Sequence, residues 1–221
     1  GGVMPNYCDN TIRLEGDKSV LSKLIEDNTI KYSSWETNNE EVDSFDLTNI
    51  RPTPKVLDQI TSGAMTHEGL SLKNWAYKNA EGEFVDQNMD NKQDDTLTLV
   101  PITITEGEYP NQTYTSTEEG EKIFAEHGAR DWYEWRRNNW GTKWVTPTPV
   151  EEVHGDVILD MSNGSESTMI EFSNQSAWGP PYELVSYICR KYNLTGSVRW
   201  HEEGGNADWG HFDNKGELIE L

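Results

Sequence analysis

Cysteine is scarce in this chain, with only Cys8 and Cys189 among 221 residues. Two distant cysteines cannot build the several disulfide bonds that hold small secreted domains together, and they lack the paired spacing of a zinc site. We therefore expect two free thiols, a reducing compartment, and neither a bound metal nor another cofactor.

Positive charge is also scarce, because 39 Asp and Glu residues are present against 18 Lys and Arg residues, which gives a formal net charge of -21. A chain this acidic repels the phosphates of DNA and RNA, so direct nucleic-acid binding is disfavoured. Two interpretations of the charge stay open. Either it keeps the protein soluble, or it forms an acidic face that occupies the basic, nucleic-acid-binding groove of a partner protein.

Long apolar runs are missing, since no stretch approaches the roughly 18 residues that a membrane-spanning helix needs. The first residues also lack the apolar core of a signal peptide. The sequence therefore predicts a soluble, intracellular protein with no membrane partner. Gly1, Gly2 and Val3 precede Met4 and are interpreted as the remnant of an expression tag.

Familiar catalytic motifs are missing as well. The chain has no Gly-x-Ser-x-Gly elbow, no Gly-x-x-x-x-Gly-Lys phosphate loop and no dinucleotide fingerprint. An acid-base candidate is formed by His201, Glu202 and Glu203 with His211, but it lacks the spacing that places two imidazoles on one helix face. We predict no catalytic residues and keep an enzyme that uses His201, Glu202 and Glu203 as an alternative.

Oxygen-bearing side chains alternate between Asp86 and Asp95, as they do in a calcium-binding loop. The sixth position is Asn91, where an EF-hand loop has glycine. The twelfth is Leu97, where the loop has a bidentate carboxylate. A solvated turn fits this segment better, and no metal site is predicted.

The spacing of apolar residues predicts an α+β fold in a single domain over residues 4–221. Alternation indicates strands at residues 7–15, 45–50, 157–161, 167–173 and 197–203. Helical spacing indicates helices from Val20 to Asp27, from Pro54 to Ile60, from the segment Thr115-Ser116-Thr117 to Gly128, from there to Gly141, and from the segment 177–181 to near Asn193.

Residues 63–114 are the least regular part of the chain and are predicted to be an insertion. Pro101 cannot donate a backbone hydrogen bond, so the apolar run at 97–104 is expected to be an edge strand or an interrupted one. Asn163-Gly164 predicts a tight turn. Residues 212–218 are expected to close the chain as a turn with extended flanks.

What the chain has in abundance is tryptophan, and four of its nine tryptophans lie within residues 131–144. This Trp-rich stretch also carries Arg136, Arg137 and Lys143, so its net charge is positive in an acidic protein. It is interpreted either as a core cluster or as a pocket in which exposed rings stack on a planar or peptide ligand while the three cations hold an anionic group.

Four strings resemble the Api92-like family of phage and plasmid proteins, also described as YubB ferredoxin-like. They are Met4-Pro5-Asn6-Tyr7-Cys8-Asp9-Asn10, then Trp132-Tyr133-Glu134-Trp135 with Asn139-Trp140-Gly141-Thr142-Lys143-Trp144, then Ala177-Trp178-Gly179-Pro180-Pro181, and Glu202-Glu203-Gly204. The expected element order is similar to a ferredoxin-like antiparallel sheet covered by helices. The resemblance implies that fold, a mobile-element origin and the cytoplasm of a bacterial host, and it implies no catalytic residue.

These observations lead to the hypothesis of a non-catalytic binding protein that inhibits a host protein, such as a defence nuclease, through an acidic surface that mimics nucleic acid. An alternative is a sponge that sequesters a small anionic, nucleotide-like signal. The residues expected to bind the ligand or partner are Trp132, Trp135, Arg136, Arg137, Trp140, Lys143, Trp144 and Trp178.

Overall fold

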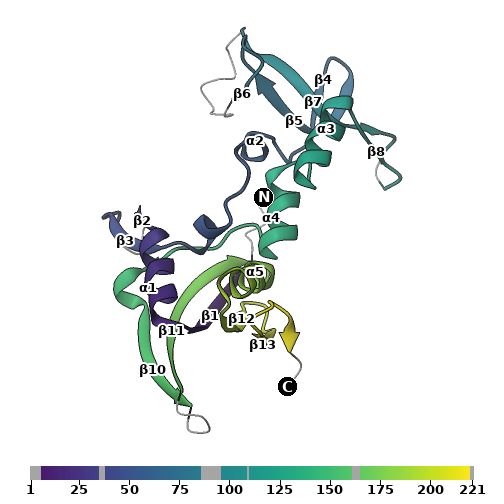
Figure 1. Cartoon of the computed structure of the whole chain (residues 1–221). Coiled ribbons are helices and arrows are strands. Elements are labelled where there is room, and N and C mark those ends of the chain that lie inside the picture. Colours follow the sequence, from purple (N-terminus) through teal and green to yellow (C-terminus); the bar gives the residue numbers. More distant parts are fainter. Residues whose placement is uncertain (1–5, 35–37, 86–95, 109, 161–164, 220–221) are drawn as a thin grey trace. The chain divides into compact units, whose positions relative to one another are not determined.

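The computed structural model of the chain describes residues 6–34, 38–85, 96–108, 110–160 and 165–219. It divides into two compact units (Figure 1). Unit 1 comprises Gly1–Pro52 and Asn138–Leu221, and unit 2 comprises Thr53–Arg137. The stretch predicted to be an insertion, residues 63–114, lies within unit 2. The turn predicted at Asn163-Gly164 lies outside the described residues.

The main sheet of unit 1 has six strands in the order β10-β11-β1-β12-β13-β14, and every neighbouring pair is antiparallel. The predicted α+β class is therefore confirmed. The strands are β1 (Tyr7–Gly16), β10 (His154–Asp160), β11 (Ser165–Ala177), β12 (Thr195–Glu202), β13 (Ala207–Phe212) and β14 (Leu218–Ile219).

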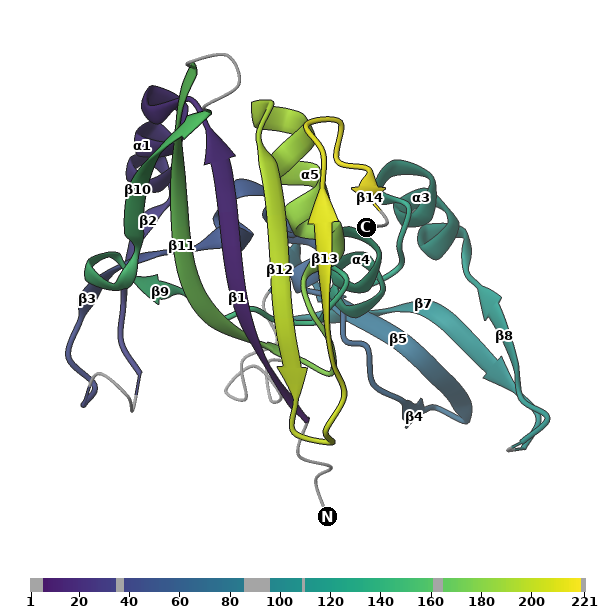
Figure 2. The same ribbon diagram turned by 90° about the horizontal axis from the view of Figure 1, so that it is seen from below.

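Helices α1 (Lys18–Asp27) and α5 (Tyr182–Tyr192) cover one face of this sheet (Figure 2). Helix α1 contacts β1 and β11, whereas α5 contacts β12 and β13. Asp17 caps α1 by accepting hydrogen bonds from the N–H groups of Ser19 and Val20, which have no partner inside the helix. Helix α5 ends where Asn193 adopts a left-handed backbone conformation.

The strand pattern of the sequence explains why the sheet has one buried and one open face. Along β1, Cys8, Ile12 and Leu14 are buried and point towards the helices. Asp9 and Arg13 alternate with them and are exposed, so they belong to the opposite, open face. Burial raises the pKa of the Cys8 thiol to about 11 and that of the Cys189 thiol to about 12, so both thiols stay protonated at neutral pH.

A second sheet of unit 1 joins β2 (Thr29–Tyr32), β3 (Val42–Phe45) and β9 (Thr148–Pro149). The strand predicted at residues 45–50 is wrong over most of its length. It ends at Phe45, after which Asp46 accepts a 2.8 Å hydrogen bond from the N–H of Thr48 and starts a 3-10 helix, η1 (Leu47–Ile50). Another 3-10 helix, η3 (Val150–Glu152), follows β9.

Unit 2 contains a sheet in the order β4-β5-β7-β8, with the short β6 paired to β5. Its elements are α2 (Lys55–Asp58), β4 (Met65–His67), β5 (Leu70–Lys78), β6 (Phe84–Val85), β7 (Thr98–Glu106), β8 (Thr113–Ser116) and α3 (Glu118–His127). Helix α4 (Trp132–Trp140) begins in unit 2 and ends in unit 1. The apolar core of unit 2 includes Leu57, Leu72, Ala76 and Ile102.

Pro101 has the effect on β7 that its missing N–H predicts. It pairs with Trp75 of β5, next to a shift in register between Asn74 and Trp75. On its other side, β8 pairs with β7 from Thr103 to Glu106 and does not reach Pro101. The proline therefore occupies a local edge of the sheet, where no neighbouring strand needs its hydrogen bond.

Candidate functional site

Two tryptophans of the Trp-rich stretch, Trp135 and Trp140, belong to the core. Only 4% of Trp140 is exposed, and its indole Nε1 donates a 2.9 Å hydrogen bond to the carbonyl oxygen of Arg51. Trp135 is also buried. The Trp140 contact fixes the end of the helix, and neither buried ring presents a stacking face to a ligand.

Arg136, one of the three expected anion-binding cations, is engaged within unit 2. Its Nη2 lies 2.8 Å from Oδ1 of Asp58, its Nε donates to the hydroxyl of Thr53, and its guanidinium lies over the ring of the partly buried Trp132. Arg137 is exposed and lies 5.9 Å from the centre of the Tyr133 ring. The Asp58 carboxylate competes with any external anion for Arg136.

Tyr7, Lys143, Trp144 and Trp178 lie together in unit 1 and are called the aromatic patch below. The rings of Tyr7 and Trp144 meet edge to face with centres 5.5 Å apart. Lys143 Nζ lies 5.9 Å from the centre of the Trp178 ring. Tyr7 pairs with Ala177, the residue before Trp178, and Ala177 exchanges hydrogen bonds with the hydroxyl of Thr142, the residue before Lys143, so the four residues lie at one end of the sheet.

Trp178 is unusual in both exposure and backbone conformation. Its φ angle is 69°, in the left-handed region that a bulky side chain rarely adopts, and 50% of the residue is exposed. Two hydrogen bonds hold the residue in this conformation. The N–H of Trp178 donates to the carbonyl oxygen of Asn6, and the hydroxyl of Ser176 donates to the carbonyl oxygen of Gly179. Such strain costs about 1–3 kcal/mol and is concentrated at functional sites in proteins.

The acid-base candidate does not converge on one place. His201 and Glu202 are consecutive residues of β12, so their side chains point to opposite faces of the sheet. Glu202 accepts hydrogen bonds from the amides of Asn206 and Asn6, which hold its pKa below the usual range, and Glu203 accepts one from the N–H of Tyr7. These carboxylates are structural acceptors at the end of β12.

No group of three or more His, Cys, Asp or Glu side chains is placed to hold a metal ion within the described ranges. The calcium-like segment from Asp86 to Asp95 lies outside those ranges. No helix in the part of the chain that the structure covers has both the length and the apolar character to cross a membrane.

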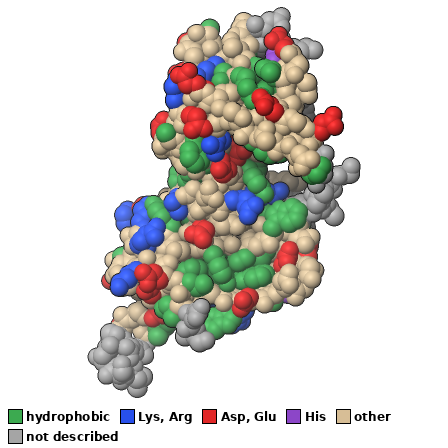
Figure 3. All heavy atoms as spheres, turned by 90° about the vertical axis from the view of Figure 1, so that its right-hand side faces the viewer, with side chains coloured by type: hydrophobic (Ala, Val, Ile, Leu, Met, Phe, Trp, Pro, Cys, Tyr) green, Lys and Arg blue, Asp and Glu red, His purple; other side chains and the backbone are tan. Residues whose placement is uncertain are grey.

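Acidic residues outnumber basic residues in both units. On the face of the molecule drawn in Figure 3, Lys and Arg side chains lie among the Asp and Glu side chains. On that face the negative charge is thus dispersed.

Sequence reasoning missed a groove on the open face of the six-stranded sheet. It has a volume of about 770 Å³, and a smaller hollow of about 300 Å³ shares Thr11, Arg199 and Trp209 with it. Arg199 of β12 and Trp209 of β13 are direct partners in the register, and 52% of Trp209 is exposed. Arg199 and Trp209 are ten residues apart in the sequence. Their proximity becomes visible only when β12 and β13 are aligned in register.

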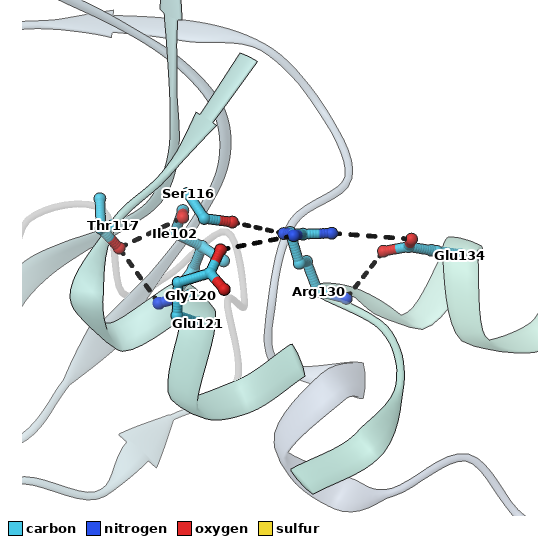
Figure 4. Close-up of polar contacts among 7 residues, drawn as sticks. All are labelled: Ile102, Ser116, Thr117, Gly120, Glu121, Arg130 and Glu134. Carbon is cyan, nitrogen blue, oxygen red and sulfur yellow. Dashed lines mark hydrogen bonds and ion pairs between the residues drawn. The ribbon is translucent and has the colours of Figure 1, made fainter. Parts of the chain in front are cut away.

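Unit 2 has a polar cluster centred on Arg130, which lies between Ser116, Glu121 and Glu134 (Figure 4). Its Nε donates to the Ser116 hydroxyl, and its backbone N–H donates to Oε2 of Glu134 at 2.8 Å. Next to it, buried Asp131 accepts a hydrogen bond from the N–H of Glu134 and another from the amide of Asn74. These contacts connect β8, α3 and α4, so the cluster has a structural role in unit 2.

Asp131 makes the stability of unit 2 depend on pH. Burial raises the pKa of its carboxyl and outweighs the hydrogen bonds that lower it. The folded protein therefore keeps a proton that the unfolded chain releases near the usual pKa of about 4. The resulting stabilisation is present below that pH and is lost as pH rises through the raised pKa.

The variant Asp131→Asn keeps an acceptor for Glu134 but does not titrate. Urea unfolding of unit 2 from about pH 4 to 7 should show the stability of the native protein, relative to this variant, falling as pH rises. A relative stability that increases with pH would contradict the assignment.

Comparison with protein-family models, curated proteins and solved structures returned no match to this chain.

Proposed function

We propose that this is a non-catalytic binding protein that inhibits a host protein, with the aromatic patch as its contact surface. The observation that carries the proposal is Trp178, which is half exposed and held in a strained left-handed conformation by its neighbours. A surface tryptophan in a position that glycine would occupy without strain indicates that the side chain is retained for contact.

The composition of the patch fits a protein partner. Tryptophan and tyrosine are enriched among the residues that dominate binding energy at protein interfaces, and they bury large areas at low cost in side-chain entropy. Trp144 and Tyr7 brace each other, and Lys143 lies near the exposed indole. The patch therefore offers pre-positioned aromatic anchors.

The net charge of -21 gives the partner's chemistry. A strongly acidic protein attracts basic surfaces over a distance and increases their association rate, so the partner is a basic protein such as a defence nuclease. On the face drawn in Figure 3 the charges are dispersed, so that face does not form a continuous surface that mimics nucleic acid.

The strand order supports a ferredoxin-like assignment for unit 1. The run β10-β11-β1-β12, with α1 after β1 and α5 between β11 and β12, is the arrangement expected for a ferredoxin-like sheet, to which β13 and β14 add further strands. We propose that unit 1 belongs to the Api92-like family and that residues 63–114 are an insertion. The protein would then be encoded by a phage or plasmid and act in the bacterial cytoplasm.

The test uses Trp178→Ala and Trp178→Gly. Immobilised full-length protein is incubated with bacterial lysate at low and high salt, and the bound proteins are identified by mass spectrometry. Native protein should retain a basic partner that high salt releases. Both variants should lose at least about tenfold in affinity, as expected for an interface anchor.

Two controls separate binding from folding. Trp178→Gly relieves the left-handed strain and should unfold about 1 kcal/mol less readily than Trp178→Ala. Tyr114→Ala removes another aromatic residue that is 58% exposed, but in unit 2, and should keep the partner. Capture that is unchanged in both Trp178 variants, or a lack of any salt-sensitive partner, would refute the proposal.

A further inference from the structure

The open face of the six-stranded sheet carries an aromatic ring and a cation side by side. Trp209 and Arg199 are cross-strand partners on neighbouring strands, and both are exposed. Directly opposite residues of an antiparallel pair have Cβ atoms about 4.5–5.5 Å apart. A planar group stacked on the indole therefore lies within reach of the guanidinium.

Arg199 differs from the other arginine on this face. Arg13 forms an ion pair with Glu171, whereas Arg199 makes no ion pair or hydrogen bond through its side chain within the described chain. A guanidinium has five N–H donors in a fixed fork that matches a phosphate, so Arg199 retains its capacity for an external anion.

The remaining lining residues suit a ribose and the edge of a base. Asp9 and Glu152 supply carboxylates, and the carboxylate of Asp9 accepts a 2.9 Å hydrogen bond from the amide of Gln175. Carboxylates accept hydrogen bonds from ribose hydroxyls and from exocyclic amino groups. The volume of about 770 Å³ lies within the usual range for small-molecule sites.

We infer that this groove binds a purine nucleoside monophosphate, with the base stacked on Trp209, the phosphate on Arg199 and the ribose near Asp9. A purine covers more of an indole than a pyrimidine does. The carboxylates of Asp9 and Glu152 and the charge of -21 oppose additional phosphates, so a nucleotide with one phosphate fits better than a triphosphate or a nucleic-acid chain. This inference goes beyond the proposed function and is independent of the aromatic patch.

Isothermal titration calorimetry of the full-length protein with AMP and GMP tests the inference without any host protein. Native protein should bind at least one of them with a dissociation constant below about 1 mM. Trp209→Ala and Arg199→Gln should each weaken binding by about tenfold or more, because stacking or a charge-assisted contact is lost. Tyr114→Ala, a variant of a similarly exposed aromatic residue in unit 2, should bind within about twofold of native protein.

Three results would overturn the inference. One is the absence of heat from AMP and GMP at millimolar concentration. Another is equal affinity in the Trp209→Ala variant, provided its circular dichroism is native. The third is tighter binding of ATP or of a short single-stranded oligonucleotide than of AMP and GMP, which would assign the groove to polyanions. Unchanged host-protein capture in the Trp178 variants would refute the proposed function but leave these titrations unaffected, so the two proposals fail separately.

Discussion

Replacing Trp140 by alanine is expected to lower the free energy of unfolding of unit 1 by about 4 kcal/mol, within the range for buried aromatic residues. The ring is almost fully buried, so its removal leaves a cavity that neighbouring side chains fill only in part. The substitution also deprives the Arg51 carbonyl of the hydrogen bond from the indole Nε1. Urea unfolding followed by circular dichroism measures the loss.

Trp209→Ala is the matched control, because it removes the same side chain from an exposed position on the same unit. Its effect on stability should stay within about 0.5 kcal/mol. Similar losses in the two variants would show that the Trp-rich stretch does not anchor the core of unit 1 and would undermine the division of the tryptophans into buried and exposed groups.

That division marks how far the sequence could predict the site. Tryptophan clustering identified residues 131–144 as important but could not separate the core rings from the exposed ones, because burial depends on what packs against them. Trp135 and Trp140 are buried, whereas Trp144 and Trp178 meet Tyr7 and Lys143 in the aromatic patch. The last association needs the pairing of β1 with β11, which are more than 150 residues apart along the chain.

Elements with strong local signals were predicted well. Helix α3 begins after Thr117, whose hydroxyl accepts a hydrogen bond from the N–H of Gly120, and ends at Gly128 with a φ of 69°. Strand β1 and helix α1 match the expected alternation and helical spacing. In each case the residues that define the element also supply its caps or its buried face.

Elements that depend on distant partners were missed. Strand β13 contains Asp208, Trp209 and Gly210, a combination with weak strand preference, yet it pairs with β12 over six residues. The Arg199–Trp209 pair therefore escaped notice. The same limit applies to residues 63–114, where the apolar run of β7 was predicted but irregular composition conceals the other strands of unit 2, which long-range pairing stabilises.

Gly120→Ala is expected to destabilise unit 2 by about 3 kcal/mol, the upper part of the usual range for overpacking. Within a helix, Gly to Ala normally stabilises by about 1 kcal/mol. Here the new Cβ would lie 2.3 Å from the carbonyl oxygen of Ile102, a backbone atom of β7 that cannot rotate away. That oxygen also accepts the N–H of Thr117, so moving α3 to relieve the clash would disrupt the start of the helix (Figure 4).

Gly128→Ala, at the C-cap of the same helix, separates steric contact from backbone preference. Its Cβ would meet no atom within 4 Å, so only the left-handed conformation opposes it, at about 1 kcal/mol. In urea unfolding, the free energy of unfolding should therefore be much lower for Gly120→Ala than for Gly128→Ala, and lower for both variants than for the native protein. A stabilised Gly120→Ala variant would mean that α3 does not pack against β7 at the separation described, and the close helix-sheet contact in unit 2 would have to be abandoned.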